Sequence, residues 1–304
     1  MKKIIRRFTI LIIILAIVDF LSGFILDKTM NLLPETTSQT AHTNTFIKHV
    51  DSDVIILGSS RATHHYIPSI ISDSLGLSVY NCGQEGMDVT YNFCCLERII
   101  SRKTPKIVLL DMDESYYLGG STQRITCLNP YYKDSRSIKD AIDLTGDAYV
   151  SFKMFFNLYR YNGKLFNIVS AVVSPVDTLN GYLPLYGSIS GKPVEHDINY
   201  AEKIDSIVFD GFQNIVNICK YKGIKLIVIN SPIFVKNKFN FQFTQQYCAE
   251  NDITYLNFGN DIFYLNRPDL FWDATHLNNE GATIFSSNIA HFLKKEKNIN
   301  SGIK

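Results

Sequence analysis

The feature that most constrains this fold is an alternation of short apolar stretches with helical stretches from about residue 51 to residue 295. Apolar stretches predict five strands, at 53–58, 78–83, 105–113, 225–233 and 253–258. Helices are predicted between and after them, at 67–77, 88–103, 201–221, 242–250 and 279–295. Fully apolar strands that alternate with helices are typical of a parallel sheet covered on both faces. The sequence therefore predicts the α/β class, with a doubly wound sheet and right-handed crossovers.

Polar residues gather where the predicted strands end, at 58–61, 81–86, 111–115 and 230–232. In a doubly wound sheet, ligands bind outside the carboxyl ends of the strands. The sequence therefore predicts a functional site along that edge of the sheet.

The N-terminus carries a separate signal. A basic cluster at 2–7 precedes an apolar run at 8–26, which is long enough to cross a bilayer as a helix. The positive-inside rule keeps the basic cluster in the cytoplasm, so the rest of the chain is expected outside. A cleaved signal peptide is the rival interpretation. An uncleaved anchor is favoured, because the run is long and no clear small-residue cleavage site follows it.

We expect a membrane anchor at 1–27, a polar, Thr-rich stalk at 28–48 and a folded domain at 49–298. Asp19 lies inside the apolar run. Because an ionisable group is costly in lipid, Asp19 is expected near the outer interface or against a partner helix.

A long insertion at about 116–199 separates the third and fourth predicted strands. It is rich in Tyr, Phe, Ser and Gly, and helices are predicted near 137–143 and 152–172. Such an insertion is either a functional lid or a packed helical cap that makes no contact with a ligand, and both remain open.

The composition is that of a globular protein, with 304 residues, 46% of them hydrophobic, and a formal net charge of +1. This charge gives no indication of nucleic-acid binding. The six cysteines lack the spacing of metal ligands and are expected to be small buried side chains. We expect no cofactor and no bound metal.

Two motifs suggest nucleophilic chemistry. The stretch VIILGSSRATHH at 54–65 ends a predicted strand in small hydroxyl residues, and DATH, from Asp273 to His276, precedes the last predicted helix. A serine hydrolase needs a nucleophile, a base and a carboxylate that orients the base. These two motifs supply all three. His64 and His65 are expected to be bystanders that face solvent.

With these motifs the chain resembles the SGNH/GDSL hydrolase superfamily. The Gly-Asp-Ser block of the superfamily corresponds to Gly58-Ser59-Ser60, and its Asp-x-x-His block corresponds to Asp273 through His276. The resemblance extends over most of the predicted domain, apart from the insertion. It implies a flavodoxin-like three-layer α/β/α fold with a five-stranded parallel sheet, beside the N-terminal transmembrane helix.

The resemblance also implies roles for individual residues. Ser60 would be the nucleophile, His276 the base and Asp273 the carboxylate that orients the base. The glycine of the second block, which follows the second strand, corresponds to Gly86, with Gly83 as the fallback.

The first block departs from the superfamily pattern. Ser59 replaces its aspartate, and Arg61 follows the serine. This GSSR form resembles a branch of envelope-associated bacterial members. Arg61 is expected either to hold an anionic substrate group or to pair with Asp111 or Asp113.

The third block departs further, because the third strand runs into DMDESYY and offers no asparagine. The asparagine of the superfamily donates a hydrogen bond to the oxyanion. Here the backbone N–H groups of Ser60 and Gly86 are the expected donors, with Ser115 or Asn230 as the uncertain third. Loss of one donor costs about 10²–10³ in rate.

The resemblance implies an extracytoplasmic serine esterase or O-acyltransferase. Its substrates would be ester-linked acyl groups, foremost acetyl, on envelope or extracellular glycans. The expected partners are an acylated glycan or small ester, the membrane, and a membrane-embedded acyl donor. The alternative is a catalytically weak or inactive SGNH-fold protein that serves as a membrane-tethered binding or scaffold protein.

Overall fold

The computed structural model of this chain describes residues 1–304 except 37, 113–120, 174–177, 197–203, 238–241 and 302–304. Five strands form one parallel sheet in the order β2-β1-β3-β5-β7. They are β1 Val54–Leu57, β2 Val79–Asn81, β3 Ile107–Asp111, β5 Lys225–Asn230 and β7 Thr254–Asn257. The chain crosses from β2 back past β1 to β3, which makes the sheet doubly wound and confirms the predicted topology.

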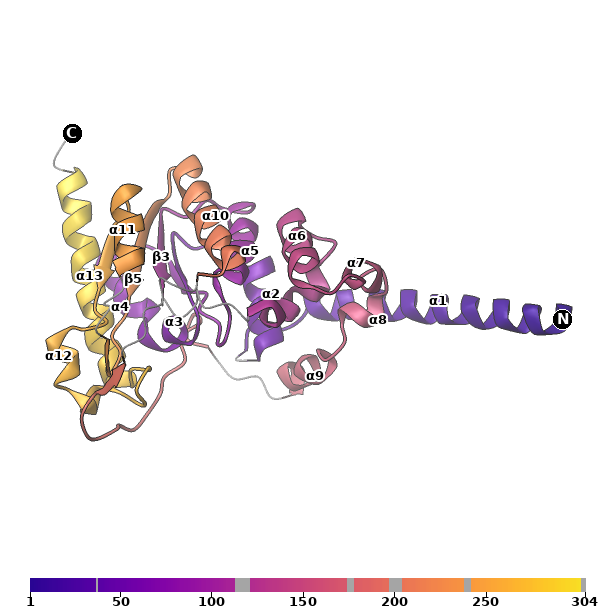
Figure 1. Cartoon of the computed structure of the whole chain (residues 1–304), viewed down its shortest axis with the longest axis horizontal. Helices are drawn as coiled ribbons and strands as arrows, with labels where there is room; N and C mark the ends of the chain where they lie inside the picture. Colours follow the sequence, from indigo (N-terminus) through magenta and orange to yellow (C-terminus); the bar gives the residue numbers. More distant parts are fainter. Residues whose placement is uncertain (37, 113–120, 174–177, 197–203, 238–241, 302–304) are drawn as a thin grey trace.

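Helices cover both faces of this sheet (Figure 1). The helices of these two layers are α2 Gln39–Lys48, α4 Pro68–Leu75, α5 Val89–Ile100, α10 Ser206–Lys222, α11 Gln242–Glu250 and α13 Asn279–Ser301. Helix α1 Lys2–Asn31 projects away from the domain. Successive side chains of β1 point to opposite faces. Ile55 and Leu57 enter the core shared with α2, α5 and α10, while Val54 and Ile56 enter the core shared with α4 and α13. The molecule is therefore the predicted three-layer α/β/α structure.

The predicted stalk at 28–48 is wrong. Helix α1 continues to Asn31, and α2 is part of the domain, with Ala41, Phe46 and Ile47 buried in the core. The Arg102 guanidinium donates hydrogen bonds to backbone carbonyls at the C-terminal end of α2. The Thr-rich composition suggested solvent exposure, but many of these hydroxyl and amide groups are buried with hydrogen-bond partners, which makes burial tolerable.

The insertion between β3 and β5 is a cap of short helices. They are η2 Ser121–Tyr131, α6 Arg136–Thr145, α7 Val150–Lys153, α8 Asn157–Arg160 and α9 Leu165–Val173. Three helices thus occupy the region where one was predicted at 152–172. The break between α8 and α9 contains Gly163, whose φ of 73° lies outside the right-handed helical region. The cap lies on the side of the domain from which α1 projects (Figure 1).

The segment 178–193 connects the cap to the carboxyl edge of the main sheet. It leads into a small parallel sheet of β4 Val194–His196 and β6 Val235–Asn237. The remaining short helices are α3 Ser60–His65, α12 Ile262–Leu265 and η4 Pro268–Leu270. All six cysteines are free and buried.

Candidate active site

A sharp turn after β1 presents Ser60 at the carboxyl edge of the sheet. Gly58 has a φ of 151°, and a Cβ at this position would lie 2.7 Å from the Ala62 Cβ and 3.0 Å from the Asp111 Cβ. Only glycine allows the chain to turn this closely against β3. The turn makes Ser60 the first residue of α3, with its side chain partly exposed.

The structure brings Ser60, His276 and Asp273 together. The Ser60 Oγ lies 2.8 Å from the His276 Nε2, although the two residues are 216 positions apart. The His276 Nδ1 lies 2.9 Å from one Asp273 carboxylate oxygen and 3.0 Å from the other. In this arrangement Nδ1–H donates to the carboxylate, so Nε2 is free to accept the serine proton. The three groups have the geometry of a nucleophile, a base and an orienting carboxylate.

The DATH loop supports the Asp273 carboxylate with its own backbone. The Asp273 Oδ1 accepts the backbone N–H groups of Thr275 and His276 at 2.7 and 2.8 Å. Burial raises the pKa of Asp273, but the hydrogen bonds from the His276 ring and the Thr275 backbone outweigh it, and the pKa lies below its ordinary value. Asp273 therefore stays ionised at neutral pH and can stabilise a protonated His276.

The expected donors to the oxyanion differ in how far the structure supports them. The Gly86 backbone N–H lies in a turn of 84–87, where a φ of 71° favours glycine and the Cβ position is open. The fallback, Gly83, already donates its N–H to the Asn81 side chain at 2.9 Å, which favours Gly86. Ser115 lies outside the described residues.

Asn230 is fully buried, and this argues against it as the third oxyanion donor. Its amide donates to the Asn257 Oδ1 at 2.9 Å, and its oxygen accepts from Arg61 at 3.1 Å. Both ends of the amide are used inside the protein.

Comparisons with known proteins find similar solved structures. No protein-family model matches the chain, and no curated protein sequence matches it. One similar solved structure is that of a protein assigned to the G-D-S-L family of lipolytic proteins, from Desulfitobacterium hafniense DCB-2. It is 12% identical, with a TM-score of 0.41, over 78% of this chain and 97% of that one.

Two further solved structures are similar. One, assigned as an acylhydrolase from Bacteroides fragilis, is 13% identical with a TM-score of 0.37, over 84% of this chain and 95% of that one. The other, assigned as a platelet activating factor from Streptococcus pneumonia, is 11% identical with a TM-score of 0.42, over 91% and 98%. These likenesses are too distant to carry an argument about activity. The main sheet has the strand order that the resemblance implies. The GSSR and DATH motifs meet at the carboxyl edge of this sheet, as the resemblance also implies. The chain has the doubly wound, flavodoxin-like fold that the resemblance to SGNH hydrolases implies.

Within this fold, the Arg61 side chain lies in the protein interior. It forms an ion pair with Asp111 at 3.0 Å, while also donating to Asn230. The expected role in substrate binding is therefore corrected to the alternative, a structural ion pair. The pair joins α3 to the ends of β3 and β5, behind the nucleophile.

His65 is also buried, so the expectation that it faces solvent is wrong. The His65 Nε2 accepts the backbone N–H of Leu277 at 3.0 Å, and its Nδ1–H donates to the Ser231 Oγ at 2.9 Å. Leu277 directly follows His276. His65 thus links α3, which begins with Ser60, to the loop that carries His276. No local sequence signal indicates this link, because the two partners are 212 residues apart.

His64 is likewise buried and packs edge-on against the His276 ring, with ring centroids 5.5 Å apart. Its Nδ1 lies 2.7 Å from the Leu183 carbonyl oxygen, and its Nε2 lies 3.0 Å from the Glu85 carboxylate. Both partners are hydrogen-bond acceptors. Leu183 belongs to the 178–193 segment, which His64 thereby fastens beside the site.

Trp272 is an exposed aromatic beside the base that the sequence analysis did not single out. Its side chain is 47% exposed, and its ring centroid lies 6.4 Å from that of His276. Its position next to the Asp-x-x-His motif could have drawn attention to it.

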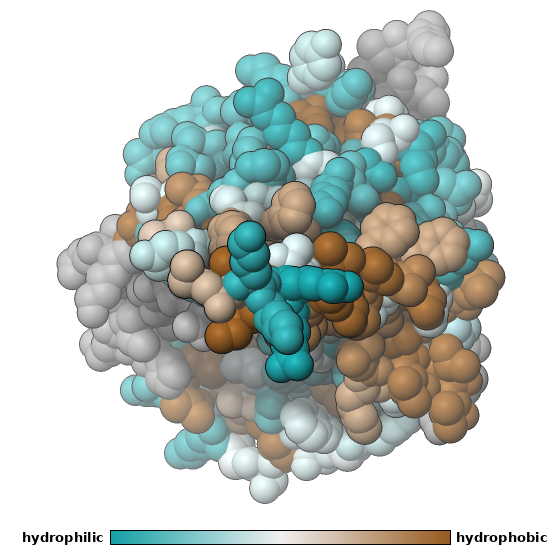
Figure 2. All heavy atoms as spheres, turned by 90° about the vertical axis from the view of Figure 1, so that its right-hand side faces the viewer, coloured by the Kyte–Doolittle hydropathy of each residue, from teal (hydrophilic) through white to brown (hydrophobic). Residues whose placement is uncertain are grey.

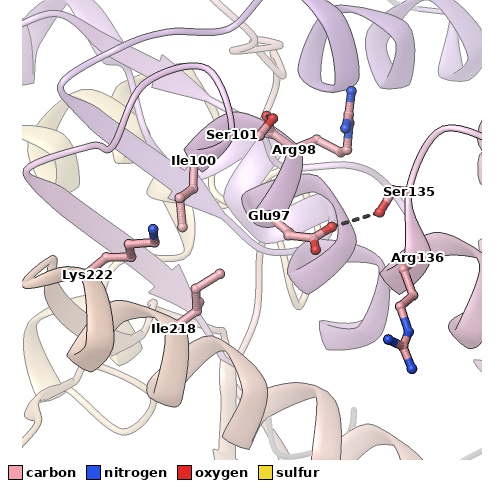
Figure 3. Close-up of a pocket in the computed structure, with 8 residues that line it drawn as sticks. All are labelled: Glu97, Arg98, Ile100, Ser101, Ser135, Arg136, Ile218 and Lys222. Carbon is pink, nitrogen blue, oxygen red and sulfur yellow. Dashed lines mark hydrogen bonds between the residues drawn. The ribbon is translucent and has the colours of Figure 1, made fainter.

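A cavity of about 460 Å³ lies between α5, α6 and α10, away from Ser60 and His276 (Figure 3). Its carboxylate, Glu97, is already held by Ser135 and Ser137. None of its lining residues comes from the carboxyl edge of the sheet. Among the described residues, no cluster of histidine, cysteine and acidic side chains could hold a metal ion.

Proposed function

We propose that this protein is a membrane-anchored serine esterase or O-acyltransferase of the SGNH type. The observation that carries the proposal is the hydrogen-bonded chain from the Ser60 Oγ through the His276 ring to the Asp273 carboxylate. A fold can be shared by proteins with unrelated activities, so the proposal depends on this geometry rather than on the fold.

The proposed reaction has two steps. His276 takes the proton of the Ser60 hydroxyl as the serine oxygen attacks an ester carbonyl, and Asp273 stabilises the resulting imidazolium. The backbone N–H groups of Ser60 and Gly86 stabilise the oxyanion. His276 then protonates the leaving alcohol, and an acyl-serine remains. Water or an acceptor hydroxyl, deprotonated by His276, removes the acyl group and restores Ser60.

The substrates we propose are ester-linked acyl groups, acetyl first, on envelope or extracellular glycans. Helix α1 is the one helix in the described part of the chain that is long and apolar enough to cross a membrane. With the basic cluster at 2–7 in the cytoplasm, the domain would lie outside, where such glycans are found. Water as acceptor makes the protein an esterase, whereas a sugar hydroxyl makes it an acyltransferase that needs a donor, which a membrane-embedded partner could supply.

One observation favours a second candidate, a membrane-tethered binding or scaffold protein with weak or no chemistry. The superfamily asparagine that donates to the oxyanion has no counterpart after β3, and the Asn230 amide is used elsewhere. A site with two donors would retain the triad but react more slowly, by about 10²–10³.

A fluorophosphonate probe, which reacts with activated serines, separates the two candidates. Labelling of the wild-type protein, and none of Ser60→Ala, is the expected result. Ser59→Ala is the matched control, because it changes the neighbouring serine and should still be labelled. If the folded wild-type protein does not react with the probe, the esterase proposal is wrong. Acetate release from acetylated glycans, measured beside acetyl transfer to them, then distinguishes hydrolysis from transfer.

A further inference from the structure

The cap carries a group of exposed apolar side chains near the C-terminal half of α1. Phe152 of α7, Leu158 of α8 and Phe155 between the two helices are exposed, with Phe155 71% exposed. Helix α9 adds a stripe that includes Phe166, 82% exposed, and Val169. We call the exposed apolar side chains of 152–173 the apolar collar. Scattered exposed apolar residues are ordinary, but a contiguous group of this kind marks an interaction surface.

Helix α8 is fastened to α1 at a defined height. The Asp19 carboxylate accepts the backbone N–H groups of Asn157 and Leu158 at 3.0 and 2.9 Å, and the Asn157 side-chain amide at 3.0 Å. Gly23 makes room for Asn157, because a Cβ there would lie 2.5 Å from the Asn157 Cγ. Near the end of α1, Tyr161 donates a hydrogen bond to Asp27.

These contacts place α8 beside the C-terminal part of the apolar run. The run at 8–26 is about 28 Å long as a helix, close to the thickness of a bilayer core. The stretch from Asp19 to Leu26 is its final part, about 12 Å long. A bilayer that covers the run would therefore also reach α8. Helices that lie in a membrane interface insert their apolar face to a similar depth, about 5–10 Å.

We propose that the apolar collar inserts into the outer leaflet of the lipid bilayer, so that the protein rests on the membrane in addition to spanning it. Figure 2 looks along α1 from its N-terminal end, toward the face that would meet the bilayer, and apolar side chains gather there beside and below the helix. The proposal rests on the membrane anchor proposed above and not on the esterase chemistry.

Charge and hydrogen bonding on the collar suit a lipid surface. Helix α9, with the sequence LFNIVSAVV, carries no charge. Cations at the collar include Lys133, above the Phe155 ring, and Lys153, paired with Asp147. Arg160 and Lys164, within the same part of the chain, are buried. Long lysine side chains can keep their ammonium groups at the headgroups while the apolar parts stay in the lipid. Asp19 is a charged residue inside the apolar run. The structure explains its presence there, because its carboxylate accepts hydrogen bonds from the first N–H groups of α8.

Depth-dependent fluorescence quenching tests the proposal on the full-length protein. The six native cysteines are buried, so an introduced exposed cysteine can be labelled selectively with an environment-sensitive dye. Phe155→Cys and Phe166→Cys report on the collar, Ile14→Cys on the anchor, and Tyr221→Cys, 84% exposed on α10, on an exposed aromatic position outside the collar. The labelled proteins are reconstituted into phosphatidylcholine–phosphatidylglycerol vesicles whose lipids carry a nitroxide on the acyl chain.

The collar and anchor positions are expected to lose most of their emission, while Tyr221→Cys keeps its emission. Quenching at Ile14→Cys without quenching at Phe155→Cys and Phe166→Cys overturns the proposal and assigns the face to a protein partner. No quenching at Ile14→Cys overturns the anchor together with the collar. Labelling of Ser60 by fluorophosphonate is independent of all three results, so a failure of the esterase is recognised separately.

Discussion

The His65 Nε2 accepts the backbone N–H of Leu277 at 3.0 Å, one residue after the histidine that contacts Ser60. The link joins α3 to the DATH loop from inside the protein, so it sets the separation between nucleophile and base without touching a substrate. We infer that His65 is a positioning residue.

His65→Ala should therefore lower kcat with little change in KM, because a displaced base weakens the chemical step more than binding. It should also cost about 1–3 kcal/mol of unfolding free energy, since the buried Leu277 N–H loses its acceptor. His65→Gln can present an acceptor oxygen and should recover part of kcat. If both variants lose stability and kcat equally, His65 is only structural. Steady-state kinetics and thermal unfolding measure the two effects.

The protein should become less stable as the pH falls below about 6.5, the ordinary histidine value. Burial lowers the pKa of His65 well below that value and that of His42 to about 4. In this window the unfolded chain binds protons that the folded protein does not. Stability is thus complete above pH 6.5 and falls by about 1.4 kcal/mol per pH unit for each histidine. Chemical unfolding of the detergent-solubilised protein at several pH values, followed through the single Trp272, measures the slope. An unchanged slope in a His42→Gln/His65→Gln variant would contradict this assignment.

Gly83 and Gly86 should respond differently to alanine. A Cβ at Gly83 would lie 2.4 Å from the Thr63 backbone nitrogen, so Gly83→Ala should lower the melting temperature strongly. A Cβ at Gly86 meets open space, and only its φ of 71° is unfavourable, at about 1–2 kcal/mol. Gly86→Ala should remain folded but lose up to about 10²-fold in kcat, because its N–H shifts from the oxyanion. A Gly86→Ala variant with wild-type kcat would remove Gly86 from the oxyanion site.

Replacing Arg61 should affect folding rather than substrate binding. Arg61→Leu deprives the buried Asp111 of its cation, which should cost about 3–5 kcal/mol. The double variant Arg61→Leu/Asp111→Leu should recover much of that stability, because no charge is then left buried. Circular dichroism melts of the two variants test the prediction. A stable Arg61→Leu protein with a raised KM for anionic substrates would restore the substrate-binding role instead.

Trp272 should matter for glycan esters and not for small esters. Its exposed ring beside His276 could stack on a sugar, an aromatic contact worth about 0.5–1.5 kcal/mol. Trp272→Ala should therefore raise KM for acetylated glycans by about 2- to 10-fold. Trp272→Phe should raise it less. Hydrolysis of p-nitrophenyl acetate by Trp272→Ala is the control and should match the wild type. An equal loss on both substrates would indicate that Trp272 only supports the His276 loop.

Elements whose causes are local can be predicted from the sequence alone. An apolar run and a polar boundary are enough to predict β1, the Asp88 side chain caps α5 by accepting the Tyr91 N–H, and Gly76 ends α4 with a φ of 63°. Each of these depends on atoms within a few residues. The resemblance to SGNH hydrolases then singled out Ser60 and His276 as the expected nucleophile and base.

Which groups meet across the chain is seen in the folded structure and not in the sequence. The approach of Ser60 to His276, the burial of Arg61 against Asp111, and the link from His65 to Leu277 join residues far apart in sequence. Burial of α2 likewise could not be read from its Thr-rich sequence, because a polar residue is stable inside a protein only when a distant partner satisfies it. His65 is therefore buried because of its position in the folded chain, which its residue type does not reveal.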